Sequence, residues 1–248
     1  KHYIPDIVLF VNGVPLVVIE CKRSAYTDPK KKPIELAIGQ LADYQRKEGI
    51  PQLFLYSQLL LALARDKAEF GTTGTPRKYW GVWQEDDLDA PIRDLLALPA
   101  GNADTLLSFP FDACADEFRK VMTGGRSVYE QDRALYALCR PERLLELIFK
   151  FVVFDNGEKK IARYQQYFVV QDILGRVRSA APDAARTGGV VWHTQGSGKS
   201  LTMVMLAKCL ALSYESDPSM ANPKIVLVTD RIDLDDQIWD TFRACGLE

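Results

Sequence analysis

Long apolar runs are missing from this sequence. The most apolar stretch, residues 53–63, is shorter than the roughly 18–20 residues that a membrane-spanning helix requires, and Tyr56, Ser57 and Gln58 interrupt it. No secretory signal opens the sequence either. We therefore expect a protein with no membrane partner. Because the sequence starts at Lys1 without a methionine and stops at Glu248 soon after a strand-like run, we expect both ends to be cut.

Paired cysteines are also missing. The five cysteines are odd in number, widely spaced and form no Cys-x-x-Cys pair. This pattern argues against a disulfide framework and against a zinc site. A reducing, cytoplasmic location is the simplest interpretation. The residues concerned are Cys21, Cys114, Cys139, Cys209 and Cys245.

The sequence also lacks an excess of positive charge, since its formal net charge is −2. Global attraction to phosphate is therefore not available, and any nucleic-acid partner must bind through local basic patches. Lys22, Arg23 and residues 30–32 form one such candidate. A solvated loop would explain these charges equally well.

The composition that is present, 47% hydrophobic and 26% charged over 248 residues, is typical of a globular chain with two units of ordinary size. Residues 4–23 read as a hairpin around Asn12-Gly13. Residues 33–48 read as a helix whose apolar positions follow the i, i+3, i+4, i+7 spacing. Residues 51–83 read as further strands. We place a first domain at 1–83 and a linker or irregular connection at 84–135.

The remaining residues, 136–248, are predicted to begin a second unit. Residues 116–180 look mainly helical. Two short apolar strands are then expected at 188–192 and 224–229, with a helix at 198–214 between them. Strand, glycine loop, helix and strand in this order open a parallel α/β unit.

The N-terminal hairpin carries a Pro-Asp…Glu-x-Lys pattern, in which Asp6 precedes Glu20 by fourteen residues and Lys22 follows. Two carboxylates supply the hard oxygen ligands that Mg²⁺ prefers, and a nearby lysine can stabilise charge that develops on a scissile phosphate. Glu20 and Lys22 share one strand face. A three-residue loop, Val11–Gly13, would place Asp6 on that face, diagonal to Glu20. Ordinary surface charges on a hairpin are the competing interpretation.

The predicted helix adds Gln40 and Tyr44, which are spaced i, i+4 and lie on one edge of its apolar stripe. An amide and a phenol at this edge can approach the metal or the DNA backbone. The pair alone means little, because surface Gln/Tyr pairs are common.

Residues 193–200 form a phosphate-binding loop pattern. Gly196 and Gly198 allow backbone N–H groups to face a phosphate, Lys199 can reach the β- and γ-phosphates, and Ser200 can ligate Mg²⁺. The strict pattern has glycine where this sequence has His193. The residues expected to hold the triphosphate are Thr194, Gln195, Gly196, Ser197, Gly198, Lys199 and Ser200.

Two further segments fit a nucleic-acid motor. Arg163 and Gln166 lie three apart on a predicted helix and can read an adenine edge, although a solvated amphipathic helix is a serious rival. Thr229–Arg231 end a predicted buried strand, and the carboxyl ends of parallel strands usually face a ligand.

The order of these motifs resembles the R (motor and endonuclease) subunit of type I restriction-modification enzymes. The motifs are Pro-Asp…Glu-x-Lys, Gln-x-x-x-Tyr, Arg-x-x-Gln, HTQGSGKS and VTDRIDLDDQ. The similarity covers most of the chain and is least clear over residues 84–135. It implies an α/β architecture in which a PD-(D/E)xK nuclease domain precedes a RecA-like lobe of a superfamily 2 helicase motor.

The resemblance also implies roles for the residues. Asp6, Glu20 and Lys22 would form the nuclease centre with Gln40 and Tyr44. Mg²⁺ would be held by Asp6 and Glu20 and, beside ATP, by Ser200; Arg163 and Gln166 would read the adenine, and Thr229–Arg231 would contact DNA. The implied partners are double-stranded DNA and the methylation and specificity subunits, which bring S-adenosylmethionine.

Several departures accompany the resemblance. Val169 stands where the adenine motif has alanine, and the sequence contains neither the acidic motor motif (Asp-Glu-x-x) nor a second motor lobe nor an upstream acidic helix of the nuclease fold. Two other functions therefore stay open: a helicase whose nuclease-like domain only binds DNA, and a non-catalytic piece that docks the motor on the methyltransferase. The motif order disfavours type III enzymes, in which we expect the nuclease after the motor.

Overall fold

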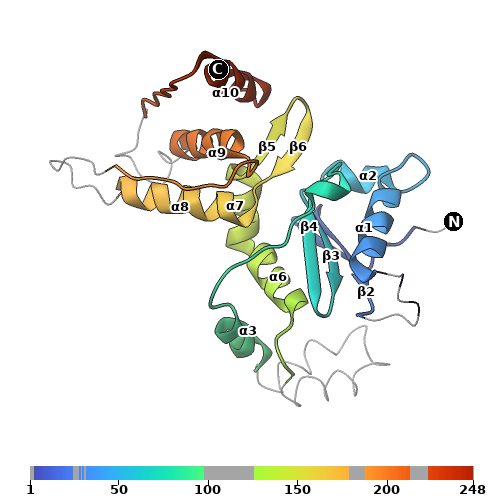
Figure 1. Ribbon diagram of the computed structural model, residues 1–248. Coiled ribbons are helices and arrows are strands. Elements are labelled where there is room, and N and C mark those ends of the chain that lie inside the picture. Colours follow the sequence, from blue (N-terminus) through green and yellow to red (C-terminus); the bar gives the residue numbers. More distant parts are fainter. Residues whose placement is uncertain are drawn as a thin grey trace.

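The computed structural model describes residues 3–24, 28, 30, 32–97, 126–178, 188–212 and 223–247. Its N-terminal half is built on a mixed sheet in the order β1-β2-β3-β4, with β1 at Ile7–Val11, β2 at Val14–Lys22, β3 at Leu59–Ala64 and β4 at Lys67–Gly71. Only β2 and β3 of this sheet run parallel. Helix α1 (Pro33–Tyr44) and the short α2 (Pro51–Phe54) make the crossover between them (Figure 1).

The β1–β2 turn differs from the prediction. Val11 pairs with Val14, so the turn has two residues, Asn12 and Gly13, both at positive φ (50° and 80°). The predicted three-residue loop is therefore wrong. A turn with two left-handed residues matches the right-handed twist of the flanking strands, which explains why the tight form wins.

The extra residue sits further along the hairpin. Phe10 pairs with Pro15 whereas Leu9 pairs with Val17, so a bulge at Leu16 shifts the register by one. The pairing then continues to Ile7 opposite Ile19. One step beyond this pair, Asp6 comes level with Glu20. The bulge, and not the turn, thus brings Asp6 onto the same sheet face as Glu20, as the candidate metal site requires.

Helix α1 covers one face of the sheet and ends earlier than predicted, at Tyr44 rather than residue 48. Its predicted apolar stripe is confirmed, since Ile34, Ala37, Ile38 and Leu41 are all buried. They pack with alternate residues of the parallel strands: Val18, Leu60, Ala62 and Ala64. Strand β3 is buried along its entire length because its other face, which carries Leu59, Leu61 and Leu63, joins a second and larger core.

The connection predicted as irregular contains a helix in its described part, α3 (Asp89–Leu96). Helices α6 (Glu130–Cys139) and α7 (Pro141–Lys150) follow, and residues 116–125 of the expected helical stretch lie outside the described residues. A hairpin then interrupts the expected helices, with β5 at Val152–Asp155 and β6 at Glu158–Ile161. Its two-residue turn, Asn156-Gly157, again has both residues at positive φ. Helix α8 (Tyr164–Arg178) completes this region.

The two apolar strands predicted for the second unit are not formed. Residues 188–192 and 224–229 have no strand assignment, and Val190, Trp192 and Val228 are about nine-tenths exposed (93%, 90% and 88%). A strand requires a hydrogen-bonded neighbour, and neither segment has one within the described part of the chain. The helices that accompany them are present: α9 at Lys199–Leu212 and α10 at Ile232–Ala244. The predicted parallel sheet of this unit is therefore absent from the described residues.

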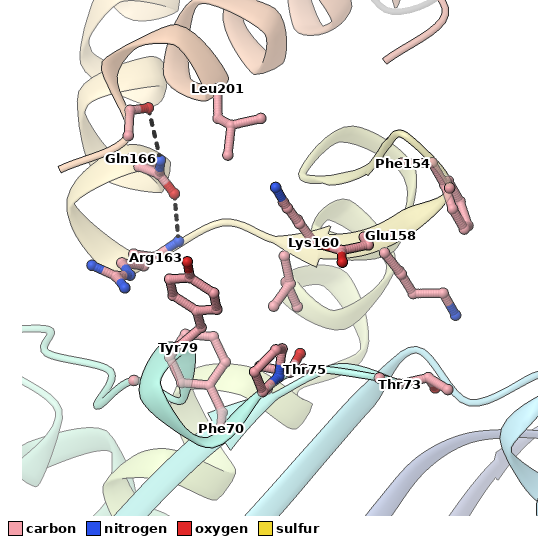
Figure 2. A pocket seen from close by; sticks show the side chains of 18 of the residues that line it. Phe70, Thr73, Thr75, Tyr79, Phe154, Glu158, Lys160, Arg163, Gln166 and Leu201 are labelled. Atoms are coloured by element: carbon pink, nitrogen blue, oxygen red, sulfur yellow. Dashed lines mark hydrogen bonds between the residues drawn. The ribbon is translucent and has the colours of Figure 1, made fainter. Parts of the chain in front are cut away.

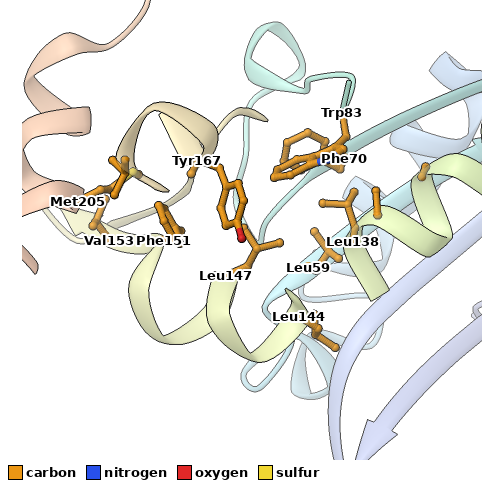
Figure 3. Close-up of a cluster of buried hydrophobic side chains, with 14 of the residues drawn as sticks. Leu59, Phe70, Trp83, Leu138, Leu144, Leu147, Phe151, Val153, Tyr167 and Met205 are labelled. Atoms are coloured by element: carbon orange, nitrogen blue, oxygen red, sulfur yellow. The ribbon is translucent and has the colours of Figure 1, made fainter. Parts of the chain in front are cut away.

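One hydrophobic cluster joins the two halves of the molecule. It runs from the free face of the first sheet, through α6 and α7, to α8, α9 and α10. Within the first half Phe70 contacts Trp83, and Trp83 in turn contacts Tyr167 of α8. Phe151 packs against the same tyrosine (Figure 3). None of the helices described is long and apolar enough to span a membrane.

Candidate functional site

The residues of the candidate nuclease centre converge at the end of β2. Glu20 is completely buried, and one of its carboxylate oxygens, Oε1, accepts a hydrogen bond from Lys22 Nζ. Asp6 lies directly before β1, and its Oδ2 accepts a hydrogen bond of 2.8 Å from the backbone N–H of Cys21. The three charged side chains predicted from the Pro-Asp…Glu-x-Lys pattern therefore lie together.

Helix α1 contributes the two residues that the Gln-x-x-x-Tyr spacing singled out. The Tyr44 hydroxyl lies 3.1 Å from Glu20 Oε2 and 2.9 Å from the carbonyl oxygen of Ile4, and it accepts a hydrogen bond from Gln40 Nε2. Tyr44 is buried, so its hydroxyl depends on these partners. The sequence did not reveal the backbone partners, Ile4 O and Cys21 N–H, because a main-chain group leaves no residue signature.

The electrostatics of this cluster follow from burial. Burial raises the pKa of Glu20; Lys22 opposes this shift, and Asp6 adds to it. Burial also raises the pKa of Tyr44 to about 12, so the phenol keeps its proton near neutral pH and can act as a donor. The centre thus places a carboxylate where its negative charge is costly without a cation.

The two carboxylates suit Mg²⁺, which does not require that all its ligands come from the protein. No group of three or more His, Cys, Asp or Glu side chains able to hold a metal occurs among the described residues. Mg²⁺ commonly binds through one or two carboxylates, together with water and substrate phosphate oxygens. Asp6 and Glu20 match that requirement in number and in chemistry.

The candidate nucleotide loop is shaped by its glycines. Gly196 (φ 75°) and Gly198 (φ 83°) take left-handed conformations directly before α9, which begins at Lys199. Lys199 Nζ donates to Thr194 O at 2.9 Å, so the lysine closes the loop on itself. Ser200 lies in the first turn of α9, and the Ser197 hydroxyl is buried without a hydrogen-bond partner. His193 precedes the turn in the chain, and Gln195 is a residue of the turn.

Gln166 of α8 clamps this loop. Its side-chain Nε2 donates to Gly198 O at 3.2 Å, and its Oε1 accepts from the backbone N–H of Arg163 at 2.9 Å. A Cβ atom added at Gly198 would lie only 2.8 Å from Gln166 Nε2. Gln166 is only 5% exposed, so a solvated helix face is the wrong description for it, whereas Arg163 is exposed. The spacing of the two residues thus brings them to the phosphate-loop candidate.

A cavity of about 690 Å³ opens beside the loop. One wall consists of Gly196–Gly198, Arg163 and Gln166, and a second comes from the β5–β6 hairpin (Figure 2). The third wall belongs to the first half of the chain and includes Phe70, Thr75 and Tyr79 (Figure 2). The volume of this cavity is in the range of small-ligand sites. Sequence reasoning missed Thr75 and Tyr79, since no local motif marks a wall contributed by a distant segment.

The last predicted segment, Thr229–Arg231, lies directly before α10. Thr229 Oγ1 and Asp235 Oδ1 are 3.2 Å apart, while Asp230 and Arg231 take part in no strand. This segment was predicted to lie at the end of a sheet strand, and in the structure it does not. Of the basic patch, Lys31 lies outside the described residues.

Comparisons with known proteins address both halves. Residues 1–79 match the family model described as the N terminus of the type I restriction enzyme R protein, and residues 165–248 match the SWI2/SNF2 ATPase model.

Curated relatives match nearly the whole chain. The HindI endonuclease subunit of a type I restriction enzyme from Haemophilus influenzae is 34% identical over 97% of this chain. A putative type I restriction enzyme endonuclease subunit from Methanocaldococcus jannaschii, MjaIXP, is 28% identical over 97%. A type I endonuclease subunit from Staphylococcus aureus, SauCOLORF180P, is 25% identical over 96%. The chain spans about a fifth of the length of these relatives (20%, 21% and 20%).

Proposed function

Since this chain is a homologue of type I restriction enzyme endonuclease subunits, we propose that it carries the DNA-cleaving centre and the nucleotide loop of an ATP- and Mg²⁺-dependent DNA translocase. One observation above all supports the proposal. Glu20, Lys22, Gln40 and Tyr44 form a continuous hydrogen-bonded network on the same chain as a glycine loop clamped by Gln166.

In this proposal the nuclease unit is of the PD-(D/E)xK type. Asp6 and Glu20 would hold Mg²⁺, and the bound ion would supply Lewis-acid chemistry toward a phosphate and a water molecule. Lys22 stabilises the negative charge that develops on the phosphate during cleavage. Tyr44 and Gln40 orient Glu20, because the Tyr44 hydroxyl approaches Oε2 and leaves Oε1 to Lys22.

The nucleotide half binds ATP through residues 194–200. The loop N–H groups and the start of α9 would receive the phosphates, Lys199 would bind a phosphate oxygen in place of Thr194 O, and Ser200 would ligate Mg²⁺. Arg163 and Gln166 then face the adenine in the adjoining cavity. Arg163 is free to do so with its exposed side chain, while Gln166 would have to share its amide between loop and base.

The partners follow from the same homology. We propose that double-stranded DNA is the substrate and that methylation and specificity subunits supply target recognition, with S-adenosylmethionine bound by those subunits and not by this chain. Thr229–Arg231 would contact DNA in the motor. ATP hydrolysis would drive translocation, and cleavage would follow at a distance from the recognition site.

The test is plasmid cleavage by the complete enzyme with Glu20→Gln. We expect cleavage to be lost while DNA-stimulated ATP hydrolysis persists. Unchanged cleavage would show that the first unit only binds DNA or docks a partner. Loss of both activities with a native circular dichroism spectrum would refute the assignment of separate centres.

A further inference from the structure

A buried cluster of charged and aromatic side chains connects the exit of the first sheet to α7 and α8. At its centre, Glu85 accepts two hydrogen bonds from Arg143, of 2.9 and 3.1 Å, one of 2.8 Å from Arg140 and one of 3.0 Å from Trp83 Nε1. The Glu85 and Arg143 side chains are only 13% and 9% exposed. Burial alone would raise the pKa of Glu85, yet these donors bring it below its usual value, so Glu85 is a carboxylate here.

Arg143 is held on its faces as well as at its edge. Its guanidinium carbon lies 4.4 Å from the centre of the Tyr167 ring, 5.5 Å from Trp83 and 5.7 Å from Phe168. The Trp83 and Tyr167 rings are themselves 5.5 Å apart (Figure 3). A planar guanidinium that is both bidentate to a carboxylate and stacked on rings has one orientation, which a lysine could not reproduce.

Tyr167 connects this cluster to the candidate nucleotide loop. It follows Gln166 directly in α8, and its own hydroxyl donates to Glu146 Oε2 of α7 at 2.5 Å. Gln166 in turn donates to Gly198 O at 3.2 Å. Contacts therefore run without a break from Glu85, through Arg143 and the Tyr167–Gln166 pair, to the backbone of the loop.

We propose that the Glu85–Arg143 pair positions α8, and through Gln166 the nucleotide loop, against the segment that leaves the first sheet. Arg143 is thus a positioning residue that couples the two halves; this inference rests on the proposed nucleotide binding. Separating a buried ion pair leaves an uncompensated charge, which is strongly unfavourable. In this proposal residues 83–85, α7 and α8 keep a fixed arrangement, so a change at the nucleotide loop alters the segment that leaves the first sheet.

A purely stabilising ion pair is the alternative, and a double-mutant cycle separates the two. The protein at its natural length is titrated with a fluorescent ATP analogue as wild type, Arg143→Met, Gln166→Ala and the double variant. We expect each single change to weaken binding about tenfold. If Arg143 acts through Gln166, the double variant binds within about twofold of the weaker single variant. Multiplied effects, about a hundredfold together, would overturn the proposal.

A control uses a second, more exposed ion pair of this chain. Arg133 is bidentate to Asp89, at 2.8 and 3.0 Å, and connects α6 to α3 instead of α8. Arg133→Met should leave nucleotide affinity unchanged. An equal loss in this control would mean that any broken ion pair weakens binding, and the proposed coupling would be wrong.

Should Arg143→Met fail to fold, Glu85→Gln supplies the same test, since it removes the charge and keeps an oxygen for Trp83 and Arg143. We expect about threefold weaker binding that disappears in the Gln166→Ala background. Failure of the proposed function looks different: the wild type would not bind the analogue, or Lys199→Ala would bind it equally well. If the folded Glu85 and Arg143 variants bind the analogue with wild-type affinity while Lys199→Ala does not bind it, the coupling is refuted and the proposed nucleotide site stands.

Discussion

The two candidate centres of this chain are built in different ways. The candidate nuclease centre gathers side chains that are far apart in sequence, since the Tyr44 hydroxyl contacts Ile4 O, 40 residues away, and Glu20, 24 residues away. The nucleotide loop is shaped mainly by neighbours within residues 194–199 and by one clamp, Gln166. The first centre lies on a paired sheet, whereas the largely exposed apolar segments 188–192 and 224–229 of the second half pair with no strand among the described residues.

This difference shows what a site needs from its surroundings. A glycine loop followed by a helix can take its shape from backbone conformation alone. A buried carboxylate requires every partner in place, because an unsatisfied charge in the interior is costly. The nuclease centre should therefore respond to substitutions anywhere in its network, and the loop to substitutions in its backbone.

The largest effect is expected from Lys199→Ala, which should abolish ATP hydrolysis and, with it, DNA cleavage. The lysine supplies a positive charge to the phosphates, and loss of one such cation can reduce turnover about 10³-fold or more. Steady-state ATPase and plasmid cleavage assays measure both effects. Lys47→Ala, an exposed lysine after α1, is the control and should match the wild type. Normal ATP turnover in Lys199→Ala would refute the loop assignment.

Lys22→Ala should separate the two activities, because it should reduce DNA cleavage and leave ATP hydrolysis nearly unchanged. Removing a group that stabilises developing charge reduces the rate about 10²–10³-fold, so cleavage should fall by this factor. ATP hydrolysis should stay within about twofold of the wild type, because Lys22 contacts Glu20 and not the loop. The same two assays decide it. A parallel loss of both activities would indicate a folding defect instead of a separate nuclease centre.

Gly198→Ala tests how far the loop depends on its backbone. Alanine at φ 83° is strained, and its Cβ would come within 2.8 Å of Gln166 Nε2. We expect nucleotide affinity to fall about ten- to hundredfold, measured by titration with an ATP analogue. Gly196→Ala is the matched control: its φ is similar, 75°, but nothing lies within 4 Å of the added Cβ. Equal effects of the two substitutions would exclude a role for the Gln166 clamp.

The smallest effect concerns stability. Tyr44→Phe leaves the Gln40 amide and Glu20 Oε2 without their shared hydroxyl, which should lower the free energy of unfolding by about 1–2 kcal/mol. Denaturant titration measures this change, while nucleotide affinity should stay constant. Tyr56→Phe, at a tyrosine that is 59% exposed, should change stability by less than about 0.5 kcal/mol. An unaltered unfolding midpoint in Tyr44→Phe would mean that the network contributes nothing to the fold.

Much of the candidate sites could be predicted from local patterns. The i, i+3, i+4 spacing identified α1 and its buried stripe, and Glu20 and Lys22 share a face because they are two apart on a strand. The Gly-x-Gly-Lys segment located the loop. Asn12-Gly13 marked a hairpin correctly, but its register could not be derived, since the bulge at Leu16 depends on pairing along both strands.

What the sequence by itself determined is the inventory of chemical groups and the helices and turns that local propensity controls. Only the tertiary structure decided which groups meet. Glu85 belonged to the stretch predicted as a linker or irregular connection, yet it is a buried partner of Arg143. Tyr79 carried no motif, yet it forms a wall of the cavity beside Gly198. Residues 224–229 had a strand's composition and formed none, because a strand exists only when another strand accepts its hydrogen bonds.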